Sequence, residues 1–444
     1  MSYNLNNITQ IDDLLFSLNN RNEIVKSLNL KHNVWNHKNG INYHILKYDK
    51  EWLARDSGTI SSKGLLRSLI FKDNGDIVCF APPKSFNINM YDLTIDPNIQ
   101  YRAEQFVEGT MINVFYDKES TTWEIATRSS VGGENCFFME NGFNNTNTFK
   151  YMFNEVCENI GFDINELNKD YVYSFVMQHH NNRIVEIIRE MRLYLVEVYQ
   201  IVDNKTINCI PINDITLFGI KKDTVRTVSV LPINNNYDLE TCIQTSASLY
   251  TNYNIVGIII KDSLGNRYKF RNPNYEYVRR LRGNNPKLQY QYLNLRQMKK
   301  DNIYQKFTKL TEYLRYYPEH RNIFNDYRNS IHDYTYNLFT NYIDCYIKKK
   351  KELKEFPEKY RTHMYKLHHE VYLKQLLPEN NYVTKAIVIE YFNNIHPAKQ
   401  MYVLNYDVRK NVSDKKNDEN NNIETETEIN SEIETEIDEL ATIV

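Results

Sequence analysis

The most informative stretch of this 444-residue sequence is Ser61-Ser62-Lys63-Gly64-Leu65-Leu66-Arg67-Ser68-Leu69-Ile70-Phe71. Two strand-like runs, Leu65–Phe71 and Ile77–Phe80, flank the turn residues Asp73-Asn74-Gly75. The second run leads into Phe80-Ala81-Pro82-Pro83-Lys84-Ser85-Phe86-Asn87. The stretch therefore predicts two strands joined by a turn, with a lysine near each outer end.

Further blocks of the same kind follow along the chain, and each combines a strand-like run with polar or charged residues. In order they are Val107-Glu108-Gly109-Thr110-Met111-Ile112-Asn113-Val114-Phe115, Trp123–Ser129, Tyr173–Met177 with Asn182-Arg183-Ile184-Val185, Asn254–Ile259, and Tyr268-Lys269-Phe270-Arg271. A Gly/Asn turn after Ile255–Ile260 predicts a hairpin with Arg267–Arg271.

One amphipathic helix is expected between these strands, over Phe149–Ile160, because Met152, Phe153 and Val156 share a face. Gly161 is placed to end that helix. Mixed strands and helices over residues 1–290 predict an α+β domain of antiparallel sheets with helices.

The pattern of apolar residues changes after residue 290. Apolar residues recur at three- and four-residue spacing from Phe324 to Cys345, and the run 303–375 has no Gly, so residues 291–410 are expected to form a helical domain. Residues 411–444 hold 11 acids against two lysines and no aromatic residue, which predicts a disordered acidic tail.

The formal net charge of −2 conceals an asymmetry, because the tail carries −9 and residues 1–410 carry +7. The tail is either a solubilising extension or a nucleic-acid mimic that folds back on the basic body.

Several other classes of protein are not expected. The sequence has no run of 18 apolar residues, so no membrane helix is predicted, and the N-terminus lacks the pattern of a signal peptide. Six scattered cysteines form no CxxC pair, which is typical of an intracellular protein with reduced thiols. No metal site is predicted, since His179 and His180 would point to opposite faces of a strand.

In their order and spacing, the blocks resemble the phage-type RNA ligase family of covalent nucleotidyltransferases over roughly residues 45–275. That family's pattern runs from an Arg-Gly strand and a hairpin ending in Arg-Pro-x-x-Lys-Phe-Phe-Asn to Lys-x-Asp-Gly, whose lysine accepts AMP. A basic strand, Phe-Glu-Phe with Asn-Arg-Ile-Val, Glu-Gly and Lys-x-Lys complete it. The resemblance implies a nucleotidyltransferase domain followed by a helical domain.

The departures from that pattern remove groups on which ligase chemistry depends. Phe106 stands where the nucleophilic lysine is expected, and it has no atom that attacks the α-phosphate of ATP. Ser174 and Val256 stand at acidic positions that in the family hold metal or the ribose. The resemblance therefore implies a degenerate, non-catalytic relative.

What the pattern retains is suited to binding phosphate. By resemblance, the nucleotide- or phosphate-binding positions are Lys63, Lys84, Glu108, Gly109, Arg128, Lys269 and Arg271. Lys269 and Arg271 are two apart on a strand, so both are expected on one face. Glu108-Gly109 is alternatively a plain strand-entry turn, and Arg128 a residue of a solvated strand edge.

RNA contacts are expected in residues 267–300, where ten Lys and Arg are interleaved with five Tyr. The candidates are Arg279, Arg280, Arg282 and Lys287. The alternative interpretation of this stretch is a solvated hairpin and linker.

Three hypotheses follow from the sequence. The first is a non-catalytic RNA ligase-like protein that binds RNA or a nucleotide. The second is an active ATP-dependent RNA ligase that uses ATP and Mg, with Lys63 or Lys84 as displaced nucleophile. The third is a structural protein without nucleic-acid binding. Abundant Asn, Ile, Lys and Tyr are typical of an AT-rich genome and resemble the composition of a large DNA virus or of a similarly AT-rich microbe. For a viral protein we expect the host cytoplasm or the virion, and a protein partner is expected on the helical domain.

Overall fold

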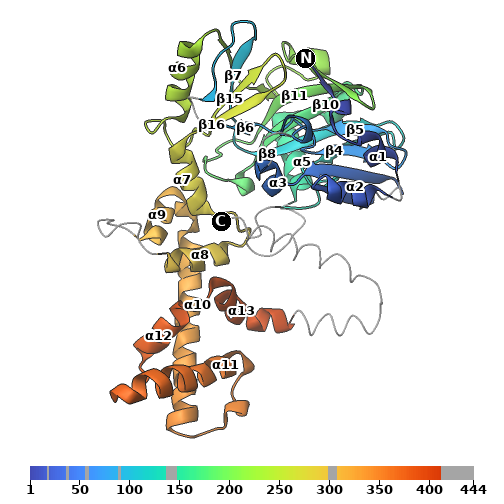
Figure 1. Cartoon of the computed structure of the whole chain (residues 1–444). Coiled ribbons are helices and arrows are strands. Elements are labelled where there is room, and N and C mark those ends of the chain that lie inside the picture. Colours follow the sequence, from blue (N-terminus) through green and yellow to red (C-terminus); the bar gives the residue numbers. More distant parts are fainter. Residues whose placement is uncertain are drawn as a thin grey trace. The chain divides into compact units, whose positions relative to one another are not determined.

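The structure is a computed structural model that describes residues 1–17, 20–36, 40–55, 60–88, 92–136, 148–298 and 308–411 (Figure 1). The chain divides into two units, Met1–Arg280 and Leu281–Val444. The expected boundary at residue 290 falls inside helix α8 of the second unit, and the predicted acidic tail lies outside the described residues from 412 onward.

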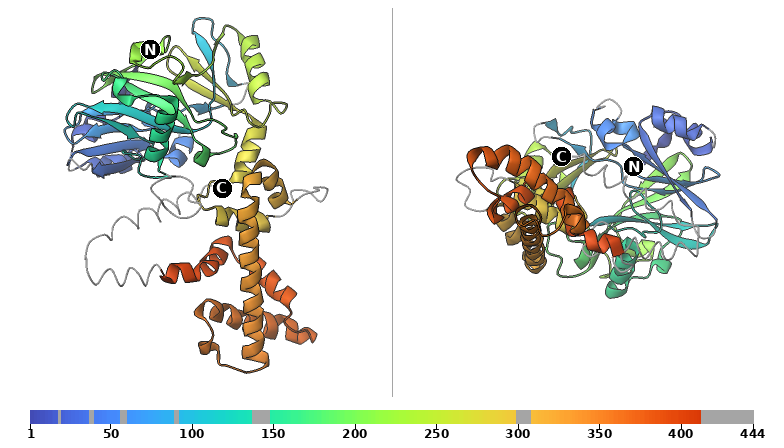
Figure 2. Two further views of the ribbon diagram at one scale, coloured as in Figure 1. Left: turned by 180° about the vertical axis from the view of Figure 1, so that it is seen from behind. Right: turned by 90° about the horizontal axis from the view of Figure 1, so that it is seen from below.

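Three largely antiparallel sheets organise the first unit (Figures 1 and 2). The largest has the order β1 (Ser2–Asn4), β12 (Thr206–Ile210), β11 (Arg192–Asp203), β10 (Val172–Gln178), β8 (Thr110–Asp117) and β9 (Thr122–Ala126), with β13 (Arg226–Thr227) parallel to β11. The second has the order β14 (Val230–Ile233), β7 (Tyr101–Gln105), β15 (Gly257–Asp262), β16 (Arg267–Arg271) and β6 (Phe86–Asn87), the last parallel to β16. The third has the order β2 (Leu30–Asn36), β3 (Asn42–Tyr48), β4 (Leu69–Lys72) and β5 (Ile77–Phe80).

Both faces of the largest sheet are covered by apolar side chains. On one face Phe115, Tyr199 and Ile207 join the core of the β2–β5 sheet, which α1 (Ile11–Phe16) and α2 (Arg21–Ser27) also line. On the other face Phe175 and Leu195 pack with α5 (Phe149–Ile160). Every residue of β10 is buried, as expected for a central strand covered on two sides.

Helix α5 confirms its prediction to the residue. The Thr148 side chain accepts a hydrogen bond from the Tyr151 N–H at its start, and Gly161 ends it with φ 68°. The predicted start of the strand Leu65–Phe71 is wrong. Leu65 and Leu66 continue the turn of α4 (Ile60–Lys63) through hydrogen bonds to the Ser62 and Lys63 carbonyls, so β4 begins only at Leu69.

The β15–β16 sheet is covered by α6 (Asn236–Ala247). Leu239 and Ile243 of this helix pack against Ile258 and Phe270. The predicted hairpin is confirmed, with Ile259 opposite Lys269. The first unit also contains α3 (Lys50–Arg55), and α7 (Pro273–Arg282) runs across the division between the units.

The described part of the second unit is helical, as predicted. Its helices are α8 (Leu288–Gln297), α9 (Lys309–Tyr316), α10 (Arg321–Tyr342), α11 (Glu358–Lys366), α12 (Lys385–Asn393) and α13 (Pro397–Leu404), with π-helical turns over Ile343–Ile347 and Leu367–Leu376. Within the described part of 303–375 the helical structure is not continuous. It is interrupted near Pro318, and again after Lys348, where Lys349 adopts φ 51°.

Buried charges join two sheets of the first unit. The Glu197 carboxylate on β11 accepts hydrogen bonds from the Lys261 ammonium on β15 and the Arg267 guanidinium on β16. Lys261 also lies 2.5 Å from Glu104 on β7. All four side chains are at least nine-tenths buried, so each charge depends on its partners for compensation.

We therefore expect Glu197→Gln to lower the free energy of unfolding of the first unit by about 3–5 kcal/mol, because it leaves buried cations undercompensated. Urea unfolding followed by tryptophan fluorescence measures this, since all three tryptophans (Trp35, Trp52, Trp123) lie in the first unit. The matched control Glu190→Gln, at an exposed carboxylate paired with Arg192, should leave the urea midpoint unchanged.

The same group sets a pH dependence. Its two cations hold the pKa of Glu197 at about 2 against the opposing effect of burial, below the ordinary value near 4.5. Its stabilisation is therefore complete above pH 4.5 and is lost as pH falls toward 2. An equal loss of stability between pH 4.5 and 2 in Glu197→Gln and in the parent protein would contradict this role, because the variant has no carboxylate to protonate.

Candidate functional site

Strand β16 presents a row of cations on one face. Tyr268 and Phe270 pack into the core under α6, so Arg267, Lys269 and Arg271 share the opposite face. Arg267 at one end is neutralised by Glu197, and Arg271 at the other pairs with Glu276 at 2.6 Å. Among the described residues, Lys269 between them makes no ion pair with a carboxylate.

Lys269 lies close to basic residues from other blocks. Burial first, and then the positive charges of Arg271, Arg67 and Lys84, lower its pKa to about 8. A lysine with an ordinary pKa near 10.5 loses charge this readily only where water and carboxylates are scarce and cations are near. The fold therefore brings the first block and the last block of the sequence together.

Tyr48 at the end of β3 lies beneath two of the predicted cations. The Lys84 ammonium lies 5.6 Å and the Arg128 guanidinium carbon 4.9 Å from the centre of its ring, both at cation–π distance. Arg128 also donates a hydrogen bond to the Tyr48 carbonyl at 3.1 Å. The Lys84 N–H donates to the Gly64 carbonyl, which ties the two halves of the first block together.

We name the residues Arg67, Lys84, Arg128, Lys269 and Arg271 the basic cluster. Burial lowers the pKa of Arg67, Lys84 and Arg128, and neighbouring cations lower the pKa of Arg67 and Lys84 further. The positive charges of Arg128, Arg67 and Arg279 add to desolvation in lowering the pKa of Lys50. A group of cations that repel one another in this way is suited to bind an anion of several charges.

Glu108 is buried and holds a loop. Its carboxylate accepts hydrogen bonds from the N–H groups of Ile184, Val185 and Glu186 at 2.9–3.2 Å, and its carbonyl accepts one from Gln178. Burial raises its pKa against the opposing effect of these donors. The carboxylate positions the segment after Asn182.

Gly109 adopts φ 148°, and a Cβ there would lie 2.4 Å from the Met177 carbonyl oxygen. Only glycine permits this close approach of β8 to β10. The geometry of Glu108 and Gly109 thus favours the interpretation of this pair as a strand-entry turn.

The residues at the three positions that depart from the family pattern have other surroundings in the fold. The Phe106 ring lies beside Arg271, with the guanidinium carbon 5.7 Å from the ring centre. The Ser174 hydroxyl is buried and donates to Asn113 Oδ1 at 2.7 Å. Val256 is buried before Gly257. No group of three or more metal-binding side chains occurs among the described residues.

The predicted RNA-binding residues lie on or beside helix α7, so the interpretation of this stretch as hairpin and linker is wrong beyond Arg271. In the first unit Arg279 pairs with Glu276 at 3.1 Å, and Arg280 is exposed. In the second unit Lys287 is exposed, whereas Arg282 is buried and offers little surface to a ligand.

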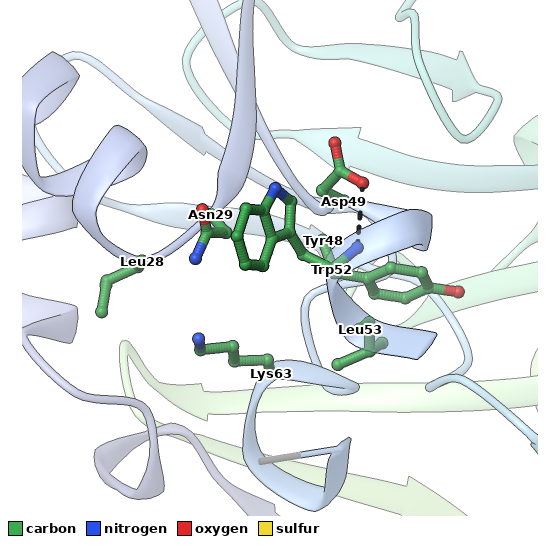
Figure 3. Close-up of a pocket in the computed structure, with 7 residues that line it drawn as sticks. All are labelled: Leu28, Asn29, Tyr48, Asp49, Trp52, Leu53 and Lys63. Carbon is green, nitrogen blue, oxygen red and sulfur yellow. Dashed lines mark hydrogen bonds between the residues drawn. The ribbon is translucent and has the colours of Figure 1, made fainter. Parts of the chain in front are cut away.

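Lys63 ends helix α4 and lines a shallow pocket with Leu28, Asn29, Tyr48, Asp49, Trp52 and Leu53 (Figure 3). Tyr48 belongs both to this pocket and to the surroundings of Lys84 and Arg128. Sequence reasoning missed Tyr48, Lys50, Trp52 and Arg67. In the run Tyr48-Asp49-Lys50-Glu51-Trp52 two aromatic residues flank a lysine just before the first block, but two acids stand between them and mask this pattern.

No family model and no curated protein matches this chain. Among solved structures, an archaeal ATP-dependent RNA ligase, form 1, matches with a TM-score of 0.37 at 13% identity. That match covers 62% of this chain and spans 64% of the length of the archaeal chain. Of the described helices, none is long and apolar enough to cross a membrane.

The lowered pKa of Lys269 predicts an unusually reactive amine. Pyridoxal phosphate, trapped with borohydride and mapped by mass spectrometry, should label Lys269 with a rate that rises through a midpoint near pH 8, because the neutral amine is the nucleophile. Arg271→Ser should move this midpoint upward, since it removes a neighbouring positive charge. A midpoint near 10.5 in the parent protein would contradict the arrangement.

Proposed function

We propose that this protein is a non-catalytic relative of RNA ligases, with a nucleotidyltransferase-type first unit, and that its basic cluster binds the phosphates of RNA or a nucleotide. Two observations support it: the order of the sequence blocks, and the proximity of their basic residues in the fold. The archaeal structure enters it only as a likeness.

The observation that carries the proposal is the undercompensated positive charge of the basic cluster. Arg67, Lys84 and Lys269 make no ion pair with a carboxylate within the described part of the chain. Burying unpaired cations costs free energy, and a bound phosphate offsets this cost. Unpaired buried cations are therefore expected at a site where a ligand supplies the missing negative charge.

Phosphate-bearing ligands are favoured over other anions because aromatic rings accompany the cations. Tyr48 and Phe106 each lie beside a basic residue of the cluster. Rings next to cations suit a ligand that has both flat bases and phosphates, as RNA and nucleotides have. Arg279 and Arg280 extend the same basic character along α7.

The absence of catalysis is part of the proposal and rests on the residues at three positions. Phe106, Ser174 and Val256 offer neither an amine nor a carboxylate where the family pattern has them. The alternative function, an ATP-dependent ligase with Mg, requires Lys63 or Lys84 to accept the nucleotide. If Mg bound, it would offset charge on the phosphates.

A labelling assay separates these two functions. The full chain is incubated with α-labelled ATP or GTP and Mg²⁺, denatured, and examined for retained label. We expect none. Label that survives denaturation and disappears in Lys63→Ser or Lys84→Ser would establish the alternative.

The binding proposal predicts a salt-dependent affinity for single-stranded RNA that depends on the basic cluster. The variant Lys84→Ser/Arg128→Ser should bind about tenfold or more weakly at low salt, with a log–log salt slope shallower by roughly 1–2, because two phosphate contacts are lost. Fluorescence anisotropy with labelled RNA measures both quantities.

Lys221→Ser is the matched control, since Lys221 is an exposed lysine of the same unit that pairs with Glu166. It should leave the affinity and the slope nearly unchanged. Equal loss in both variants would indicate a diffuse charge effect. RNA binding absent from the parent chain at low salt would favour a purely structural protein.

A further inference from the structure

Trp52 exposes a large aromatic surface beside the basic cluster. Its side chain is 50% exposed, whereas the next residue, Leu53, is 2% exposed and anchors α3 in the core. Asp49 Oδ1 accepts hydrogen bonds from the N–H groups of Glu51 and Trp52, at 2.8 and 3.4 Å. These bonds fix the first turn of α3, and half of the Trp52 surface faces solvent.

The pocket around Trp52 has the shape of a shelf. Its volume of about 20 Å³ has room for little more than water, too little to admit a ring. A flat ligand can lie on the indole but cannot enter beneath it. Figure 3 shows the Lys63 side chain extending beneath the indole toward Asn29 and Leu28.

Polar groups around this shelf suit a base that bears a phosphate. The Asn29 amide offers donors and an acceptor to a ring edge, and the Lys63 ammonium offers a positive charge. The acid of the pocket, Asp49, is engaged with the helix N–H groups and lies 3.7 Å from Lys31. Tyr48 forms the wall between this pocket and the cations Lys84 and Arg128.

We propose that a nucleobase of the bound ligand stacks on Trp52, with its phosphate directed toward Lys63 and the basic cluster. The inference rests on the proposed function for its phosphate contacts and adds a base-binding position. The source of the base is an unpaired residue of an RNA strand or a free nucleotide, which share this chemistry.

Tryptophan fluorescence tests the position directly, because base stacking quenches an indole. The probes are a single-stranded oligoadenylate, AMP, and inorganic polyphosphate, which has charge but no base. Oligoadenylate should quench the full chain and polyphosphate should bind without quenching. Quenching by AMP would identify a free nucleotide as a sufficient source, whereas quenching by oligoadenylate alone would identify a strand; both support the proposal.

Variants assign the signal to one ring. Trp52→Phe should abolish most of the quenching while it retains affinity within about threefold, since a phenyl ring still stacks. Trp52→Ala should lower oligoadenylate affinity by about 5- to 100-fold and leave polyphosphate affinity unchanged. Trp35→Phe, a substitution outside the shelf, should preserve the quenching. Thermal melting verifies that each variant is folded.

The outcomes separate this inference from the proposed function. If neither polyphosphate nor oligoadenylate binds, the proposed function fails. If both bind, but Trp52→Ala binds oligoadenylate like the parent chain and the quenching disappears only in Trp35→Phe, the stacking position is overturned while phosphate binding stands.

Discussion

The buried ion pairs of Glu197 with Lys261 and Arg267 are the constraint on which the first unit depends. Glu197 belongs to the largest sheet, and its two cations belong to the β15–β16 hairpin of another sheet. Apolar contacts join the largest sheet to the β2–β5 sheet and to α5, and they hold α6 on the β15–β16 sheet. A buried carboxylate that must meet two cations specifies a register between the sheets, because any slip leaves charges unpaired in a medium of low polarity.

That register also aligns the surface above it. Arg267, Lys269 and Arg271 occupy one face of β16, so anchoring Arg267 to Glu197 fixes where the other two lie. The two arginines at the ends of the row each pair with a glutamate, whereas Lys269 between them has no carboxylate partner among the described residues. The strand that joins two sheets thus also carries Lys269, a phosphate-binding group of the proposed function.

The sequence predicted those parts of the fold that local rules decide. Helix α5 was predicted to the residue, since Thr148, the apolar face and Gly161 act within a few residues of one another. The start of β4 was not, because Leu65 and Leu66 are apolar residues used in a turn, and their burial comes from the tertiary core. The convergence of Lys84, Arg128 and Lys269 was expected only from resemblance, since no local pattern joins residues so far apart. Trp52 could not be singled out, because exposure of an aromatic ring is decided by what packs around it.

Phe106 lies beside the basic cluster without adding charge to it. A lysine at this position would place another positive charge beside Arg271, in a region where cations already lower the pKa of Lys269. The phenylalanine ring instead attracts the guanidinium through its electron-rich face. Repulsion within the basic cluster is therefore lower with phenylalanine at this position than it would be with lysine. An uncharged ring suits the anion-binding site that we propose, whereas the alternative ligase function requires its amine elsewhere, at Lys63 or Lys84.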